Sequence, residues 1–218
     1  MKLTTKDNVE IACDWYPAEN PAGYLVLLHM MPATKESWKE FAEMAAGKGL
    51  SSIAIDLRGH GESAGGPEGY NAFADEEHQQ SMKDVEAAVE FLSARGKGER
   101  VLPEKIVLVG ASIGANLALW YLAEHPEIKK AILLSAGEDY RGIKIPPLMQ
   151  KLSAGQSLLM FASRDDVRKG GSNASVNERL AAMVPAGVAK RLVVYDSGGH
   201  GTSFLSQAGG DMIEFIKG

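Results

Sequence analysis

The sequence predicts an α/β fold in which a mostly parallel sheet carries helices on both faces. Short apolar segments alternate with helical segments along the whole chain, which is the pattern of βαβ units. Several strand segments are apolar at almost every position, as strands covered on both faces are. No repeat, long linker or charge block divides the 218 residues, so we expect a single domain over residues 1–218.

Seven strand segments support this prediction. Residues 9–15 alternate between apolar and polar, as a half-exposed strand does, whereas residues 24–28 form a continuous apolar run. The remaining strands are short and mainly apolar. They are expected at residues 51–55, 105–109, 130–134, 157–161 and 191–195.

Five helical segments separate or follow these strands. The clearest covers residues 82–92, where apolar residues recur at helical spacing and form one stripe. Another begins after residue 112 and stops at Pro126, because proline cannot continue a helix. The others are expected at residues 38–46, 177–184 and 212–216.

Two stretches lack a clear pattern, residues 64–80 and residues 138–156. Loops of this length in a compact domain tend to carry function or to move. We expect these two stretches to be the segments that cover a pocket, with residues 138–156 as the candidate for a minimal cap. A small cap leaves little room, so short acyl groups are expected to fit better than long ones.

Composition and charge exclude several classes of protein. The chain has 23 Lys and Arg against 28 Asp and Glu, so neither a nucleic-acid partner nor a membrane surface is expected. Cys13 is the only cysteine, which rules out an internal disulfide framework and a thiolate metal cage. The histidines and carboxylates show no metal-ligand spacing, so no metal is predicted. The first residues lack the apolar stretch of a secretory signal, and we expect a soluble, cytoplasmic protein of unspecified oligomeric state.

A serine lies where the strand at residues 105–109 is expected to turn into a helix. In open parallel sheets the chemistry is carried by residues just beyond the carboxyl ends of the strands. There the segment Gly110-Ala111-Ser112-Ile113-Gly114 matches G-x-S-x-G, the pattern of a nucleophile elbow. Residues 61–65 match it too, but a polar turn precedes them and Gly66-Pro67 follow. We therefore predict Ser112 as the nucleophile.

A serine hydroxyl needs a base to accept its proton, and the chain has five histidines to weigh. His200 follows the last strand, and the glycines around it let the ring reach across the sheet edge. His78 and His125 lie beside polar helix ends, where exposure to solvent is expected, and His60 sits in a glycine turn. His200 is the predicted base.

The base in turn needs a carboxylate that fixes its tautomer and steadies its charged form. Asp165 and Asp166 are adjacent after the strand at residues 157–161, so only one of them can point inward. Counting along the strand favours Asp166, with Asp165 as the alternative. Asp139, after the preceding strand, is a weaker third candidate.

Two backbone N–H groups are expected to bind the oxyanion that forms during attack. The first belongs to Ile113, at the start of the helix, where the helix dipole supports it. The second is expected in the loop after residues 24–28, at Met31. The flexible side chains of Met30 and Met31 are expected to line the acyl pocket. His29 is expected first to brace this loop and second to border the substrate.

Together these segments resemble the α/β-hydrolase superfamily over essentially the whole chain, and within it the small serine esterases and dienelactone-hydrolase-like enzymes. The resemblance implies an eight-stranded sheet, a small or absent cap, a triad of Ser112, Asp166 and His200, and no cofactor. It is carried by Gly110-Ala111-Ser112-Ile113-Gly114, Asp56-Leu57-Arg58-Gly59-His60-Gly61-Glu62-Ser63, Arg164-Asp165-Asp166 and Gly199-His200.

Two departures from the family pattern narrow the expected activity. The oxyanion loop reads His29-Met30-Met31-Pro32, where the family commonly has His-Gly. The nucleophile is a serine, whereas dienelactone hydrolases have a cysteine nucleophile. The predicted activity is hydrolysis of small-molecule carboxylic esters through an acyl-enzyme. A thioesterase, an acyltransferase or a cofactor-free perhydrolase would use the same triad. A binding protein on a hydrolase fold is the alternative from another class.

Overall fold

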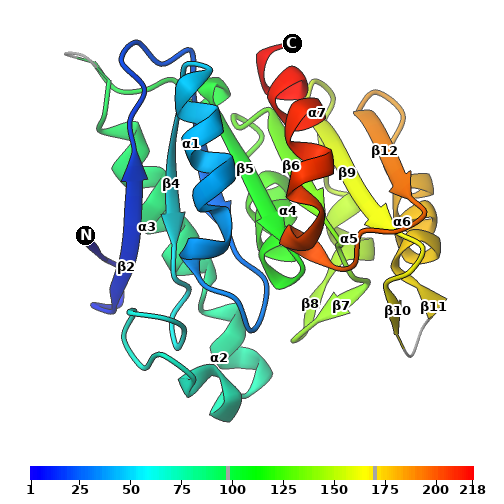
Figure 1. The fold of residues 1–218 in the computed structure, drawn as a ribbon, viewed down its shortest axis with the longest axis horizontal. Coiled ribbons are helices and arrows are strands. Elements are labelled where there is room, and N and C mark those ends of the chain that lie inside the picture. Colours follow the sequence, from blue (N-terminus) through cyan, green and yellow to red (C-terminus); the bar gives the residue numbers. More distant parts are fainter. Residues whose placement is uncertain (97–98, 169–170) are drawn as a thin grey trace.

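The computed structural model describes residues 1–96, 99–168 and 171–218, and an eight-stranded sheet forms its centre (Figure 1). The strand order is β1-β2-β4-β3-β5-β6-β9-β12. β1 and β2 pair antiparallel with their neighbours, and the other strands run parallel. The strands are β1 (Lys2–Thr4), β2 (Glu10–Tyr16), β3 (Gly23–Leu28), β4 (Leu50–Ile55), β5 (Ile106–Ala111), β6 (Lys130–Leu134), β9 (Ser157–Ser163) and β12 (Ala189–Tyr195).

Helices cover both faces of the sheet, as the alternating pattern predicts (Figure 1). One face is covered by α1 (Lys39–Gly47) and α7 (Leu205–Lys217). These helices contribute Phe41 and Met212, respectively, to the core on that side of the sheet. The other face is covered by α3 (Met82–Ser93), α4 (Ile113–Glu124) and α6 (Asn173–Ala182). Because both faces are buried, β3, β4 and β5 are buried at every position.

The predicted α/β class, the strands and most helix positions are confirmed, with two helices longer than expected. α6 begins at Asn173 rather than at residue 177, and α7 begins at Leu205 rather than at residue 212. In α7 the pair Gly209-Gly210 hides the helical pattern. A Cβ on Gly209 would lie 2.7 Å from the end of the exposed Met44 side chain of α1, so α7 and α1 lie close together at this point.

The two stretches without a clear pattern both contain short elements beyond the carboxyl ends of the sheet strands (Figure 1). The first contains η2 (Gly69–Ala72) and α2 (Asp75–Gln79), and the second contains the hairpin β7 (Asp139–Tyr140) and β8 (Ile143–Lys144) followed by α5 (Ile145–Met149). Gln79 on α2 donates a hydrogen bond to the carbonyl of Arg141 at the hairpin tip (3.2 Å). Ile145 and Met149 of α5 are buried in the core, so the part of this stretch that projects is the hairpin.

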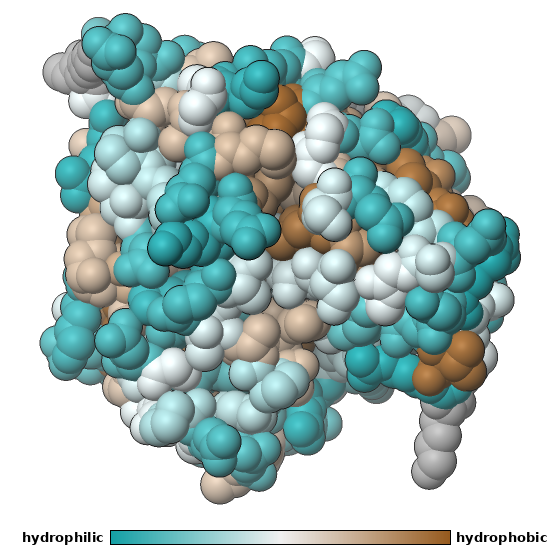
Figure 2. Space-filling model, viewed as in Figure 1, coloured by the Kyte–Doolittle hydropathy of each residue, from teal (hydrophilic) through white to brown (hydrophobic). Residues whose placement is uncertain are grey.

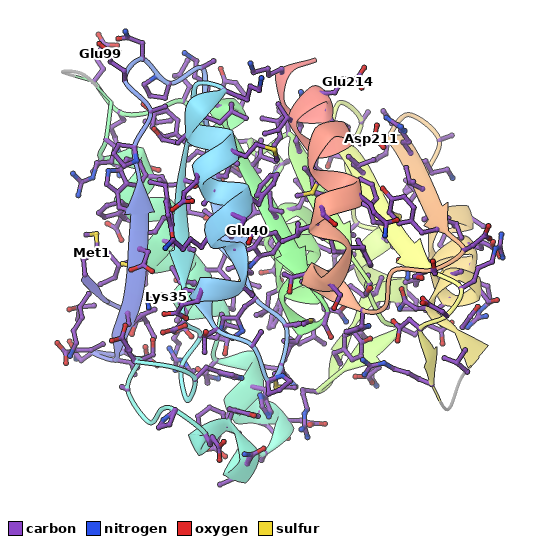
Figure 3. All side chains as sticks on the ribbon, viewed as in Figure 1. Met1, Lys35, Glu40, Glu99, Asp211 and Glu214 are labelled. Carbon is purple, nitrogen blue, oxygen red and sulfur yellow. The ribbon has the colours of Figure 1, made fainter. Side chains whose placement is uncertain are left out.

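Smaller elements complete the described chain. A second hairpin joins β10 (Val167–Arg168) and β11 (Gly171–Ser172), and short 3-10 turns occur at η1 (Lys35–Trp38), η3 (Pro103–Lys105) and η4 (Gly201–Phe204). Lys35 lies at the lower end of α1, where its backbone N–H donates to Asp56 (Figure 3). The surface in Figure 2 is mainly hydrophilic, with apolar residues in small separate areas. Within the described ranges, no helix has the length and apolar character needed to cross a membrane.

Candidate active site

Ser112 lies in a sharp turn between β5 and α4. Its φ is 54° and its ψ is −118°, a conformation that non-glycine residues rarely adopt and that is found at strained functional sites. A Cβ on Gly110 would lie 2.0 Å from the carbonyl oxygen of Gly114, and a Cβ on Gly114 would lie 2.3 Å from that of Leu28. Only glycine at these two positions therefore lets the strand, the helix and the end of β3 approach so closely.

The other G-x-S-x-G segment has a structural role. Ser63 is buried, and its hydroxyl donates to the carbonyl of Asp56 (2.6 Å) and accepts from the N–H of Ala12 (2.8 Å). The same turn includes Arg58, whose guanidinium pairs with the fully buried Asp84 (2.7 Å). These contacts fix the turn after β4. The hydroxyl of Ser63 donates its proton to the backbone and is therefore not available as a nucleophile.

His200 and Asp166 are paired. Nδ1 of His200 lies 2.5 Å from Oδ2 of Asp166. The Asp166 side chain is buried, and its other oxygen, Oδ1, accepts from Nε of Arg168 (3.3 Å). Burial lowers the pKa of His200 below its ordinary value of 6.5, partly opposed by the hydrogen bond to Asp166. Nε2 of His200 is buried and has no hydrogen-bond partner among the described residues. The ring is thus neutral at pH 7 and has a nitrogen free to accept a proton.

The three candidate acids are clearly separated by their contacts. Asp165 accepts hydrogen bonds from the N–H groups of Gly198 (3.1 Å) and Gly199 (3.0 Å), so its carboxylate holds the backbone of the His200 loop. Asp139 accepts from the N–H of its own hairpin turn at 2.8 Å. Asp166 is the one of the three whose carboxylate contacts the ring of His200.

The His200 loop packs against the nucleophile elbow, although 88 positions separate the two residues in the sequence (200 − 112). The N–H of Gly201 donates to Oγ of Ser135, at the end of β6 (2.9 Å). A Cβ on Gly201 would lie 3.3 Å from Cβ of Ala111, the residue directly before Ser112. The fold thus brings the two loops together at one edge of the sheet.

The loop after β3 borders the same place. His29 is fully buried; its Nε2 accepts from the N–H of Leu57 (3.0 Å) and its Nδ1 donates to the carbonyl of Met30 (2.9 Å). Burial lowers the pKa of His29 to about 3, so the ring stays neutral. Bracing is therefore the role that the structure shows for His29. The second expectation, that His29 borders the substrate, stays a prediction; the ring itself is fully buried.

Met30 and Met31 are both partly exposed, and their role in lining an acyl pocket stays a prediction. The thioether of Met30 accepts a hydrogen bond from Thr202 (3.9 Å), which ties this loop to the segment after His200. A Cβ on Gly114 would also meet the carbonyl of His29 at 2.7 Å, so the loop lies directly against the start of α4. The N–H groups assigned to Met31 and Ile113 belong to these two adjoining segments.

One of the three remaining histidines differs from expectation. His78 is buried, not exposed, because its ring packs edge-on against Phe73 (ring centroids 5.4 Å apart) within the 64–80 stretch. His60 is also buried and stacks on Tyr70 with ring centroids 4.1 Å apart. His125 is partly exposed and pairs with Glu127. Among the described residues, no contact joins any of these three rings to Ser112.

Tyr140 lies beside the site and was not among the residues predicted from the sequence. It belongs to β7, and burial raises the pKa of its hydroxyl, a rise that the charge of Arg168 and the neighbouring Ser112 partly oppose. The hairpin turn is Arg141-Gly142, and both residues have positive φ (54° and 77°). A glycine between two short β-prone pairs is a hairpin signal, but strands of two residues are too short to show a period.

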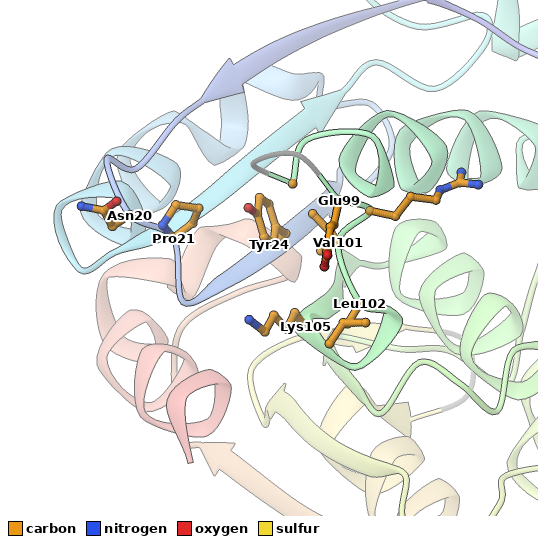
Figure 4. Close-up of a pocket in the computed structure, with 9 residues that line it drawn as sticks. Asn20, Pro21, Tyr24, Glu99, Val101, Leu102 and Lys105 are labelled. Atoms are coloured by element: carbon orange, nitrogen blue, oxygen red, sulfur yellow. The ribbon is translucent and has the colours of Figure 1, made fainter.

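One surface pocket adjoins the candidate site, and another lies away from it. A pocket of about 310 Å³ is lined by Tyr140, Arg168 and Val176 and adjoins the site through Tyr140. A second pocket, of about 360 Å³, lies near the first residues of β3 and β5 (Figure 4), whereas Ser112 follows the last residue of β5. Within the part of the chain that the structure describes, no group of three or more His, Cys, Asp or Glu side chains could hold a metal ion.

The sheet order, the strand–serine–helix turn and the buried acid–histidine pair define an α/β-hydrolase. A family model described as serine aminopeptidase, S33, matches residues 19–184, so the chain belongs to that hydrolase family.

Known proteins agree with this assignment. The chain is 31% identical over 169 residues to a bifunctional esterase/perhydrolase of Acinetobacter calcoaceticus, covering 76% of this chain and 52% of that protein. It is 33% identical over 172 residues to a non-heme chloroperoxidase of Burkholderia pyrrocinia, covering 77% and 53%. The chain thus spans about half the length of the curated relatives it matches. The esterase Pf2001 of Pyrococcus furiosus shares the fold, with a TM-score of 0.75 and 19% identity over 100% of this chain and 90% of that chain.

Proposed function

We propose that this hydrolase cleaves small carboxylic esters through an acyl-enzyme formed on Ser112. The observation that carries the proposal is the buried Asp166–His200 pair, because its free Nε2 belongs to a loop that packs against the Ser112 elbow. A neutral imidazole held by a carboxylate is the base that a serine nucleophile needs.

In the proposed reaction, Ser112 Oγ attacks the ester carbonyl and its proton passes to Nε2 of His200. Asp166 stabilises the imidazolium, and the backbone N–H groups of Ile113 and Met31 hold the oxyanion. His200 then gives the proton to the departing alcohol. In the second half, water attacks the acyl group, His200 accepts the proton of that water, and Ser112 is released.

The direct test is turnover of p-nitrophenyl acetate, with an initial burst of one p-nitrophenolate per chain when deacylation is slower than acylation. Hydrolysis of an amino-acid p-nitroanilide, with no ester turnover, would instead favour a peptidase. An absence of turnover with both substrates would favour a binding protein on this fold.

Chain length provides a second test of the same proposal. The hairpin β7–β8 and the α2 segment are the projecting parts that meet near the site, and together they are small. Acetyl and butyryl esters of p-nitrophenol are therefore expected to have a higher kcat/KM than decanoyl or longer esters. A kcat/KM that rises steadily with chain length would contradict the small-pocket proposal.

The pH dependence follows from the state of His200. The base must be neutral to accept a proton, and burial lowers its pKa below 6.5. The kcat/KM for ester hydrolysis should therefore fall on the acid side with an apparent pKa below 6.5, and activity should persist at pH values where an exposed histidine is protonated. A pH–rate profile measures this, and an acid limb centred above 6.5 would contradict it.

Perhydrolysis is the second candidate, and the curated relatives favour it because one is described as an esterase/perhydrolase and another as a non-heme chloroperoxidase. Hydrogen peroxide would replace water in the second half, so that its oxygen bonds to the acyl carbon and a peracid leaves. Peracid release from acetate ester plus peroxide, measured beside acetate release, gives the ratio of the two activities. Thioester turnover and transfer to added alcohols test the thioesterase and acyltransferase alternatives in the same way.

A further inference from the structure

The end of β6 contacts the two loops that carry the candidate nucleophile and the candidate base. The carbonyl of Leu134, the last residue of β6, accepts a hydrogen bond from the N–H of Ser112 (2.8 Å). The hydroxyl of Ser135, one position later, accepts from the N–H of Gly201 (2.9 Å), the residue directly after His200. Two adjacent residues at one strand end therefore set the spacing between the Ser112 turn and the His200 loop.

The contact between Ser135 and Gly201 lies in the interior of the protein. Ser135 has no exposed surface, and Gly201 is buried as well. Two other N–H groups of the loop, those of Gly198 and Gly199, donate to the exposed carboxylate of Asp165, where water can take its place. Water has no such access to the N–H of Gly201, so the buried end of the loop depends on the Ser135 hydroxyl as its acceptor.

The backbone of Ser135 is strained. Its φ is 54°, in the left-handed region that favours glycine, where a Cβ crowds the backbone. Neighbouring contacts hold this conformation: the N–H of Ser135 donates to the carbonyl of Phe161 (2.9 Å), and the next carbonyl accepts from Asn173 (3.1 Å) and Asn177 (2.9 Å). Non-glycine residues held in such conformations cluster at functional sites. Here a serine supplies what glycine lacks, a hydroxyl oxygen for the N–H of Gly201.

We propose that Ser135 is a positioning residue, which holds His200 within reach of Ser112 and so speeds both acylation and deacylation. The proposal rests on the acyl-enzyme mechanism proposed above, in which His200 moves a proton in each half of the reaction. Nε2 of His200 must come within hydrogen-bond distance of Oγ of Ser112 and later of the attacking water. Because small displacements of a reacting group lower rates steeply, an anchor next to His200 affects the reaction without touching the substrate.

Two substitutions of Ser135 separate the effect of the hydroxyl from that of the backbone strain. Ser135→Ala removes the hydroxyl and keeps the Cβ, whereas Ser135→Gly removes the hydroxyl and relieves the strain. Both should lower kcat and kcat/KM for p-nitrophenyl acetate by about 10- to 100-fold, with KM within about twofold of wild type. Inactivation by a fluorophosphonate should slow by a similar factor, because that reaction also needs His200 to accept the proton of Ser112.

Melting temperatures distinguish this positioning role from a general weakening of the fold. Ser135→Gly should melt roughly 2–4 °C above Ser135→Ala, because glycine adopts the positive φ without strain. The two variants should nevertheless lose activity equally, since both lack the hydroxyl. If the loss of activity arose from weakened folding alone, the more stable Ser135→Gly would keep more of it.

The matched control is Asn8→Gly. Asn8 also has a positive φ (61°), and it lies in the exposed turn between β1 and β2. Asn8→Gly should not lower the melting temperature, and it should keep kcat and KM within about twofold of wild type.

An unchanged kcat/KM in both Ser135 variants, a change confined to KM, or a Ser135→Gly clearly more active than Ser135→Ala would each overturn the proposal and leave the esterase function standing. If Ser135→Ala did not fold, Ser135→Gly beside Asn8→Gly would decide, because a folded Ser135→Gly with wild-type kcat/KM contradicts the positioning role. Wild-type protein that neither turns over ester nor reacts with the fluorophosphonate would overturn the proposed function itself.

Discussion

Ser112→Ala should lower kcat for ester hydrolysis by a factor on the order of 10⁶, the loss typical of removing the nucleophile of a serine triad. The turn of the elbow depends on its backbone and on Gly110 and Gly114, and not on the hydroxyl. The free energy of unfolding should therefore change by less than about 1 kcal/mol. Steady-state kinetics and thermal unfolding of the same preparation measure the two effects.

Ser63→Ala is the control for this variant, because Ser63 belongs to the second G-x-S-x-G segment. Its buried hydroxyl holds the turn after β4 through Asp56 and Ala12, so its loss should reduce stability by about 1–3 kcal/mol and leave kcat within a few-fold of wild type. If Ser63→Ala abolished turnover while Ser112→Ala kept it, the assignment of the nucleophile would be wrong.

Asp166→Asn should lower kcat by about 10⁴-fold, because an amide no longer fixes the correct tautomer of His200 or stabilises its charged form. The amide is nearly the same size as the carboxylate, and the backbone carbonyl of Asp166 still accepts from the N–H of Asn173 (2.8 Å). The folded structure should therefore persist, which circular dichroism can check. The loss should appear in kcat with little change in KM.

Asp165→Asn provides the matched comparison one position earlier in the chain. Its carboxylate is exposed and accepts from two backbone N–H groups of the His200 loop, so the amide keeps an oxygen acceptor there. We expect kcat to fall less than about tenfold, from a small displacement of the loop. A larger loss for Asp165→Asn than for Asp166→Asn would reverse the assignment of the acid.

Much of the fold could be predicted because strands buried on both faces are recognisable without any partner information. The runs that became β3 and β6 are apolar at nearly every position, and their ends agree with the structure to within one residue. α7 was harder to delimit, because Gly209-Gly210 weakens the helical pattern, and the packing of the helix beside Met44 of α1 involves residues that are distant in sequence. The short β1 and the two hairpins have too few residues to show any period.

The residues of the candidate site likewise include some that could be predicted from the sequence and some that could not. Ser112 could be found because the elbow is local: two glycines at fixed spacing, a strand before and a helix after. The choice between Asp165 and Asp166 depends on which side chain turns toward another loop, and counting along one strand only favours an answer. Tyr140 could not be found, because its place beside the site depends on Asn116 and Gly137 holding a hairpin in a particular position.

Histidines show most clearly what a single sequence leaves open. His78 was expected in solvent because it lies beside a polar helix end, but the ring is buried against Phe73. His29 ends a strand beside the elbow and so resembles a substrate-facing residue, yet both of its nitrogens bind backbone. Burial of a polar ring depends on partners from other segments, and hydropathy along the chain carries no signal for it.

The most direct measurement is the mass of the intact protein after reaction with a fluorophosphonate, followed by peptide mapping of the product. A hydroxyl activated by the His200–Asp166 pair should take up one adduct per chain, located on Ser112, at a rate that falls below pH 6.5 as the imidazole becomes protonated. A protein that stays unmodified, or one that carries the adduct on any other residue, would contradict the catalytic role of these three side chains.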